Sequence, residues 1–112
     1  MEESNLIRFF GGSPFLRILD ALMDNLGESY TKKELQETAG VSKGAFFAHW
    51  PKFEELGLVK STRVIGKTRL FTLDRANPLV KDLLRLEMRL IERTAPEAAL
   101  VNVHRTPKKS PA

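Results

Sequence analysis

The sequence contains no cysteine, so it can form neither a disulfide nor the cysteine ligands of a structural zinc site. Histidine is scarce too, with only His49 and His104 present. Two histidines without cysteine do not make the usual ligand set of a regulatory metal, and His49 is better explained as a helix-packing residue. We therefore expect no metal and no cofactor, and the lack of cysteine fits a reducing compartment.

Long apolar runs are also missing. No stretch approaches the roughly 20 apolar residues that span a bilayer, so we expect no membrane partner. The start of the chain, residues 1–5, is acidic and lacks the basic and apolar regions of a secretory signal, which predicts a cytoplasmic protein. A glycine-rich phosphate loop, a nucleophile elbow and paired carboxylates with a plausible cleft are absent as well, so we do not expect an enzyme.

The chain has enough apolar residues for the core of one domain, and its charge is distributed unevenly along the sequence. Its 112 residues are 42% hydrophobic, which suits a single domain with tails. The net charge of +4 divides into −3 over residues 1–30, +4 over residues 31–75 and +3 over residues 76–112. Positive charge favours a polyanionic partner, although an anionic lipid surface or a merely solvated face would have the same composition.

The first quarter of the chain predicts a short arm followed by a helix. Residues 1–12 form the arm, and its apolar side chains are expected to pack: Leu6, Ile7, Phe9 and Phe10. Ser13 is a suitable N-cap and Pro14 a suitable first helical residue. Apolar residues then recur at helical spacing to about Asn25, and Gly27 is expected to end the helix.

Two short capped helices come next. The sequence Thr31-Lys32-Lys33-Glu34 is a capping box, in which the Thr31 hydroxyl and the Glu34 carboxylate each bond to the other residue's backbone amide. Gly40 is expected to close this helix in the left-handed conformation. Val41 then fills the turn, and Ser42 caps the following helix.

The third helix has an apolar seam and an unusual outer face. Phe46, Trp50 and Phe53 are spaced for burial, with Leu56 continuing the seam. The residues expected to face outward are Lys43, Gly44, Phe47 and Ala48. Pro51 has no amide to donate to the carbonyl of Phe47, which predicts a helix that kinks near Trp50 or is split in two.

A β-hairpin and a long helix are predicted after that. Residues 58–65 and 68–73 are β-prone runs separated by Gly66-Lys67, which suits a type II′ turn. Cations are expected to cluster about the tip: Arg63, Lys67 and Arg69. Asn77-Pro78 then starts a fourth helix within residues 76–93, whose apolar residues form two adjacent seams. That width predicts a dimerisation helix with contacts at Leu79, Val80, Leu83, Leu84, Met88 and Ile91.

The stretch from Phe10 to Leu73 resembles winged-helix transcriptional regulators of the arsenical-resistance and multiple-antibiotic-resistance repressor type, most of all their small archaeal relatives. Four segments carry the likeness: Phe10-Gly11-Gly12-Ser13 before Arg17-Ile18-Leu19, Tyr30 to Leu35, Gly40 to Gly44, and Phe53 to Val59. The resemblance implies a homodimer with the third helix in the major groove and the hairpin on the backbone or in the minor groove.

The predicted fold is therefore mainly α with a β-hairpin (α+β). It comprises an apolar arm (1–12), a winged helix-turn-helix domain (13–75), a C-terminal dimerisation helix (76–93) and a disordered basic tail (94–112). The residues expected to contact double-stranded DNA are Lys32, Lys33, Ser42, Lys43, Gly44, Phe47, Arg63, Lys67 and Arg69.

Each of these residues has a simpler explanation. Ser42 can act as a cap alone, the lysines can be solvated, and charged hairpin edges also prevent aggregation. Phe47 suits a thymine methyl or sugar edge, and suits burial against a protein partner equally well. The leading hypothesis is a cytoplasmic, nucleoid-associated regulator with an unknown effector. The alternatives are nonspecific DNA coating by a chromatin-like or plasmid-partition protein, and a winged helix adapted to bind protein.

Overall fold

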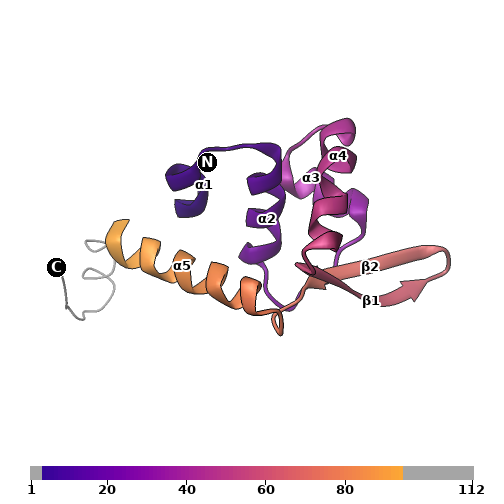
Figure 1. Ribbon diagram of the computed structural model, residues 1–112. Helices are drawn as coiled ribbons and strands as arrows, with labels where there is room; N and C mark the ends of the chain where they lie inside the picture. Colours follow the sequence, from indigo (N-terminus) through magenta and orange to yellow (C-terminus); the bar gives the residue numbers. More distant parts are fainter. Residues whose placement is uncertain (1–3, 95–112) are drawn as a thin grey trace.

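The computed structural model describes residues 4–94, which form five helices and one two-stranded antiparallel sheet (Figure 1). In chain order these are α1 (Asn5–Phe10), α2 (Pro14–Asp24), α3 (Lys32–Ala39), α4 (Lys43–Glu55), β1 (Val59–Ile65), β2 (Thr68–Leu73) and α5 (Pro78–Thr94). The predicted α+β class is confirmed, and so is the order of its elements. The expected basic tail lies outside the described residues, apart from Thr94.

The N-terminal arm contains one short helix, α1, of six residues. The Ser4 hydroxyl accepts a hydrogen bond from the Ile7 amide at 3.1 Å and caps it. Leu6 and Ile7 are buried, as expected, against the neighbouring helices α2 and α5. Phe9 and Phe10 remain 63% and 51% exposed, so the expectation that all four apolar side chains pack holds for two of them.

The predicted caps of α2, α3 and α4 are all present. Both bonds of the capping box form, from the Thr31 amide to Glu34 Oε1 at 2.9 Å and from the Glu34 amide to Thr31 Oγ1 at 3.0 Å. Gly40 closes α3 with φ 70° and ψ 33°, the left-handed conformation that favours glycine. These short helices begin and end where local hydrogen bonding requires.

Helix α4 is one continuous helix with Pro51 inside it, so of the two predicted outcomes, a kink near Trp50 or a split, the split does not occur. The proline removes the bond to the Phe47 carbonyl, but burial of Phe46, Trp50 and Phe53 holds the helix on both sides of that gap. The expected continuation of the seam to Leu56 is wrong. Leu56 is the C-cap and is 44% exposed, because the buried seam ends at Phe53.

Strands β1 and β2 pair as the predicted hairpin, which we call the wing. Gly66 in its turn has φ 64°, a value that the primed hairpin turns require. The register shifts between Ser61 and Arg63, so the wing contains a bulge. Tyr30, before α3, adds an isolated bridge to Phe71, with amide-to-carbonyl distances of 2.8 and 2.7 Å. The wing is thereby tied to the start of α3.

Aromatic rings dominate the core between α2, α3, α4 and the base of the wing. Trp50 stacks on Phe46 and on Phe53, with ring centroids 5.2 and 5.7 Å apart, and meets Phe71 edge-on at 5.2 Å. His49 contacts Phe15 edge-on at 6.3 Å, which agrees with a packing role for this histidine. Such contacts fix the orientation of α4 relative to the wing.

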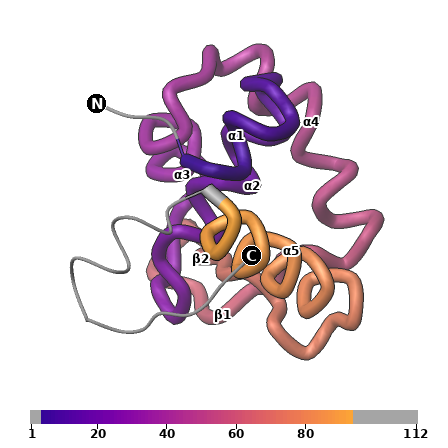
Figure 2. The backbone as a smooth tube through the Cα atoms, turned by 90° about the vertical axis from the view of Figure 1, so that its left-hand side faces the viewer, coloured from indigo at the N-terminus to yellow at the C-terminus, as the bar shows by residue number. Residues whose placement is uncertain are grey.

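Asn77 connects the end of α4 to the start of α5. Its Nδ2 donates to the carbonyls of Leu56 at 3.0 Å and Gly57 at 2.6 Å, and its Oδ1 accepts from the Leu79 amide at 2.8 Å. Helix α5 then runs away from the wing along α1 and α2 (Figures 1 and 2). Among residues 4–94 no helix combines the length and apolar character needed to cross a membrane.

Candidate nucleic-acid interface

The first part of the candidate interface is the N-terminus of α4. The Ser42 hydroxyl accepts from the Ala45 amide at 3.1 Å, and Gln36 Nε2 donates to the Val41 carbonyl at 3.0 Å, which braces the turn between α3 and α4. Lys43 and Gly44 are exposed beside this cap. The remaining free amides and the positive end of the helix dipole suit an anion.

The outer face of α4 is apolar, as the sequence predicts. Phe47 is 47% exposed, and Ala48 and Pro51 are exposed next to it. The Phe47 ring lies edge-on to buried Phe46, with centroids 5.3 Å apart and ring planes at 85°. This exposed ring is therefore anchored to the core.

The wing distributes its cations over two faces. Val64 pairs with Arg69 and Arg63 with Leu70, and because side chains alternate along a strand, Arg63 points to the opposite face from Arg69. All the same, Arg63, Lys67 and Arg69 are exposed. The prediction that the three cations form a single cluster at the tip is therefore wrong. The bulge before Arg63 sets a strand register that places Arg63 and Arg69 on opposite faces of the wing.

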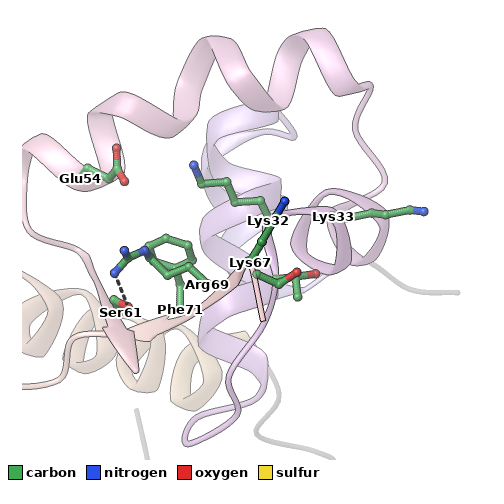
Figure 3. A pocket seen from close by; sticks show the side chains of 9 residues that line it. Lys32, Lys33, Glu54, Ser61, Lys67, Arg69 and Phe71 are labelled. Carbon is green, nitrogen blue, oxygen red and sulfur yellow. Dashed lines mark hydrogen bonds between the residues drawn. The ribbon is translucent and has the colours of Figure 1, made fainter. Parts of the chain in front are cut away.

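A basic hollow lies where α3, α4 and the wing meet (Figure 3). It is lined by Thr31, Lys32, Lys33, Glu54, Ser61, Lys67, Thr68, Arg69 and Phe71. Arg69 Nη1 donates to Ser61 Oγ at 3.3 Å, which holds the guanidinium against the strand beside it. Four cations face one acid among the described residues of this lining, so the hollow favours an anion.

Lys32 is fixed more firmly than a surface lysine. Its Nζ lies 5.7, 5.8 and 6.0 Å from the ring centroids of Phe71, Trp50 and Phe47, distances at which a cation is attracted to aromatic faces. In Figure 3 Lys32 is directed toward Glu54 and Phe71, whereas Lys33 points away from them. The two lysines, equivalent in the sequence, are therefore not equivalent in the structure.

Sequence reasoning missed several residues of the hollow. No local motif of the sequence singles out Glu54, Ser61, Thr68 or Phe71. Their roles depend on strand register and on the packing of the wing against α3, which no local motif encodes. The alternation of Ser61, Arg69 and Phe71 on one face of a hairpin would have been a usable signal had the bulge been foreseen.

The proposed dimerisation residues on α5 divide into three groups. Leu79, Met88 and Ile91 are exposed by 41%, 58% and 41%, and Leu83 and Leu84 are half-buried. Val80 is 0% exposed and packs in the chain's own core, so its assignment to a dimer contact is corrected. Val80 lies on the face of α5 that packs against the winged helix.

Carboxylates meet where α2 packs on α5, a grouping that sequence reasoning did not find. Asp20, Asp24 and Glu87 offer oxygens that all lie within 4.8 Å of one another. Burial, and then the charge of Asp20, raises the pKa of Asp24. Burial, and then the charges of Asp24 and Asp20, raises the pKa of Glu87. Both shifts mean that ionisation here opposes folding.

Helix, turn, helix and wing in this order define a winged helix-turn-helix fold. A scan against protein-family models finds no match, and a search of curated proteins finds none. Among solved structures, the chain is similar to a MarR family transcriptional regulator from Silicibacter pomeroyi, with a TM-score of 0.52 at 20% sequence identity. The match covers 85% of this chain and 68% of that one. The winged-helix fold inferred from the sequence is confirmed, while the likeness to archaeal members stays a prediction.

Proposed function

We propose that the protein is a DNA-binding transcriptional regulator that acts as a winged-helix homodimer, with α4 in the major groove and the wing on the backbone or in the minor groove. The observation that carries this proposal is the basic hollow, in which Lys32 and Lys33 at the start of α3 lie with Lys67 and Arg69 of the wing, while α4 contributes Glu54. The fold that this chain shares with a transcriptional regulator supports the same function. A cytoplasmic, nucleoid-associated location follows from it.

The proposed contacts to DNA phosphates come from four cations of each protomer: Lys32, Lys43, Lys67 and Arg69. Lys32 is held over aromatic rings and Arg69 is bonded to Ser61, so both lose less conformational freedom on binding than free side chains would. Lys33, Ser42, Gly44, Phe47 and Arg63 remain candidate contacts around them. Phosphate contacts position a protein on the duplex without reading its sequence.

Salt dependence is the direct test of DNA binding. Eight phosphate contacts in a dimer predict that the logarithm of affinity falls with the logarithm of salt concentration with a slope on the order of −7. Fluorescence anisotropy with a labelled duplex of random sequence measures this slope. A slope near zero would refute DNA binding through phosphate contacts. Lys81→Glu, which alters an exposed cation on α5, is the matched control and should leave the slope unchanged.

The proposed dimer uses the exposed apolar residues of α5 together with those of α1. Phe9 and Phe10 on α1 and Met88 and Ile91 on α5 are each at least 41% exposed, and the two helices are in contact. Exposed apolar side chains gathered on adjacent helices favour a protein interface. Sedimentation equilibrium should give twice the chain mass for the natural protein and the monomer mass for Met88→Glu. A monomer mass for the natural protein as well as for Met88→Glu would refute this interface.

The apolar outer face of α4 is the specific observation that keeps a protein-binding role as the second candidate. Phe47 is 47% exposed there, and a partner's apolar surface would cover it. The two roles differ in their response to salt, because DNA binding weakens steeply with salt and apolar contact does not.

Competition between random DNA and the promoter of the protein's own gene separates regulation from nonspecific coating.

A further inference from the structure

The outer face of α4 has no side chain that can form a hydrogen bond with a base edge between Gly44 and Pro51. Gly44, Phe47, Ala48 and Pro51 follow one another at helical spacing on one face, and all four are exposed. The flanking cations, Lys43 and Lys52, suit phosphates, and Glu55 continues the face only at the end of the helix. Side chains such as asparagine, glutamine and arginine, which read bases by paired hydrogen bonds, are missing from these positions.

Phe47 is positioned on this face as a rigid contact. Its ring rests edge-on against Phe46, which is completely buried, and Lys32 Nζ lies 6.0 Å from the Phe47 ring centroid. Gly44 adds room, since a Cβ built there meets no atom within 4 Å, and the backbone can approach a surface closely. The face therefore presents a fixed aromatic ring beside a low, smooth backbone.

Major-groove chemistry leaves one base feature that such a face can recognise. The polar groups on the base edges in this groove are hydrogen-bond donors or acceptors, whereas the C5-methyl of thymine is an apolar group that projects into the groove. We propose that α4 selects DNA by contact with pyrimidine 5-methyl groups, with Phe47 as the principal contact and Ala48 as its neighbour. The inference rests on the proposed function, because it requires α4 in the major groove.

Synthetic duplexes test the inference without a known operator. Alternating dA–dT is compared with alternating dA–dU, which lacks only the methyl, and alternating dG–dC with the same duplex carrying 5-methylcytosine. Burial of one methyl corresponds to roughly fourfold in affinity, so each methylated duplex should bind more tightly by that factor per methyl contacted. Equal affinities within both pairs would overturn the inference. Absence of salt-dependent binding to all four duplexes would instead refute the proposed function.

Two variants determine whether the methyl is read by Phe47 or acts through the shape of the groove. Phe47→Ala should abolish the preference for methylated duplexes while leaving the salt slope unchanged, since Phe47 is uncharged. Lys67→Ala is the matched control, because loss of a phosphate contact should weaken binding to all four duplexes alike and preserve their ratios. A methyl preference that survives undiminished in Phe47→Ala would show that Phe47 does not read the methyl, and would overturn the assignment. Circular dichroism verifies that both variants remain folded.

Discussion

The two ends of the molecule differ in what they expose. At one end α3, α4 and the wing expose cations held in place, such as Lys32 over three rings and Arg69 on Ser61. At the other, α1 and α5 expose apolar side chains such as Phe9 and Met88. Apolar side chains are exposed at the first end too, at Phe47, Val64 and Ile65, so its fixed cations are what distinguish it. Fixed cations suit a polyanion and exposed apolar side chains suit a protein surface, and on this difference we propose DNA as the partner of the first end and a second protomer as the partner of the other.

The largest effect is expected from neutralising the wing at the cationic end. The double variant Lys67→Ala and Arg69→Ala removes four of the eight proposed phosphate contacts of a dimer, so the salt slope should shrink from the order of −7 to about −4. Anisotropy titrations over a series of salt concentrations measure both slopes. Arg63→Ala should have a smaller effect than Arg69→Ala, because Arg63 lies on the opposite face of the wing. Equal effects would show that the two faces contribute alike.

Val80 and Leu79 sharpen the contrast within α5 itself. Val80→Ala should lower the free energy of unfolding by about 2 kcal/mol, because it removes methyl groups from a side chain that is 0% exposed. Leu79→Ala, at a position 41% exposed, should cost much less in the monomer. Urea denaturation at low protein concentration measures both. A Val80→Ala variant as stable as the natural protein would contradict the placement of Val80 in the core.

Asn77 joins the two ends, and its loss should have an intermediate effect. Asn77→Ala removes the cap of α5 and the donor that bonds to the Leu56 and Gly57 carbonyls, at an expected cost of about 1–2 kcal/mol. Thermal unfolding followed by circular dichroism checks this. Asn77→Asp is the matched variant, since it retains the cap acceptor but loses the donor, and it separates the two contributions. No change in either variant would refute the bridging role.

Local chemistry made most of the fold predictable. The capping box at Thr31 and Glu34, the left-handed Gly40 and the Gly66 turn each depend on residues within a few positions of one another, so the sequence specifies them directly. Even Pro51 was recognised correctly as a missing amide. A split, one of the two outcomes predicted for the missing amide, does not occur because burial of Trp50 and Phe53, a tertiary effect, outweighs the loss of one hydrogen bond.

The candidate site was predictable only in part, because its geometry depends on contacts between distant segments. Lys32 and Lys33 are neighbours of the same type, yet aromatic rings from α4 and β2 surround only the first. The split of Arg63 from Arg69 depends on a bulge, and the buried position of Val80 depends on which face of α5 meets α2. Periodicity indicated that α5 has two apolar seams but could not tell which one the core would take.

The smallest effect is expected where α2 meets α5. Because the pKa of Glu87 is raised in the folded protein, its proton stabilises the fold at acidic pH, and that stabilisation is lost as pH rises through the raised value, above the ordinary 4.5. Glu87→Gln should therefore raise the melting temperature slightly at pH 7, and the advantage over the natural protein should shrink as pH falls toward 4.5. Solvent screening limits its size, since Glu87 is half-buried. Glu92→Gln, an exposed change on the same helix, is the control and should shift melting little at either pH. A Glu87→Gln variant that is less stable than the natural protein at pH 7 would mean that this carboxylate has a favourable partner, and α5 would then be held to the winged helix by charge as well as by apolar packing.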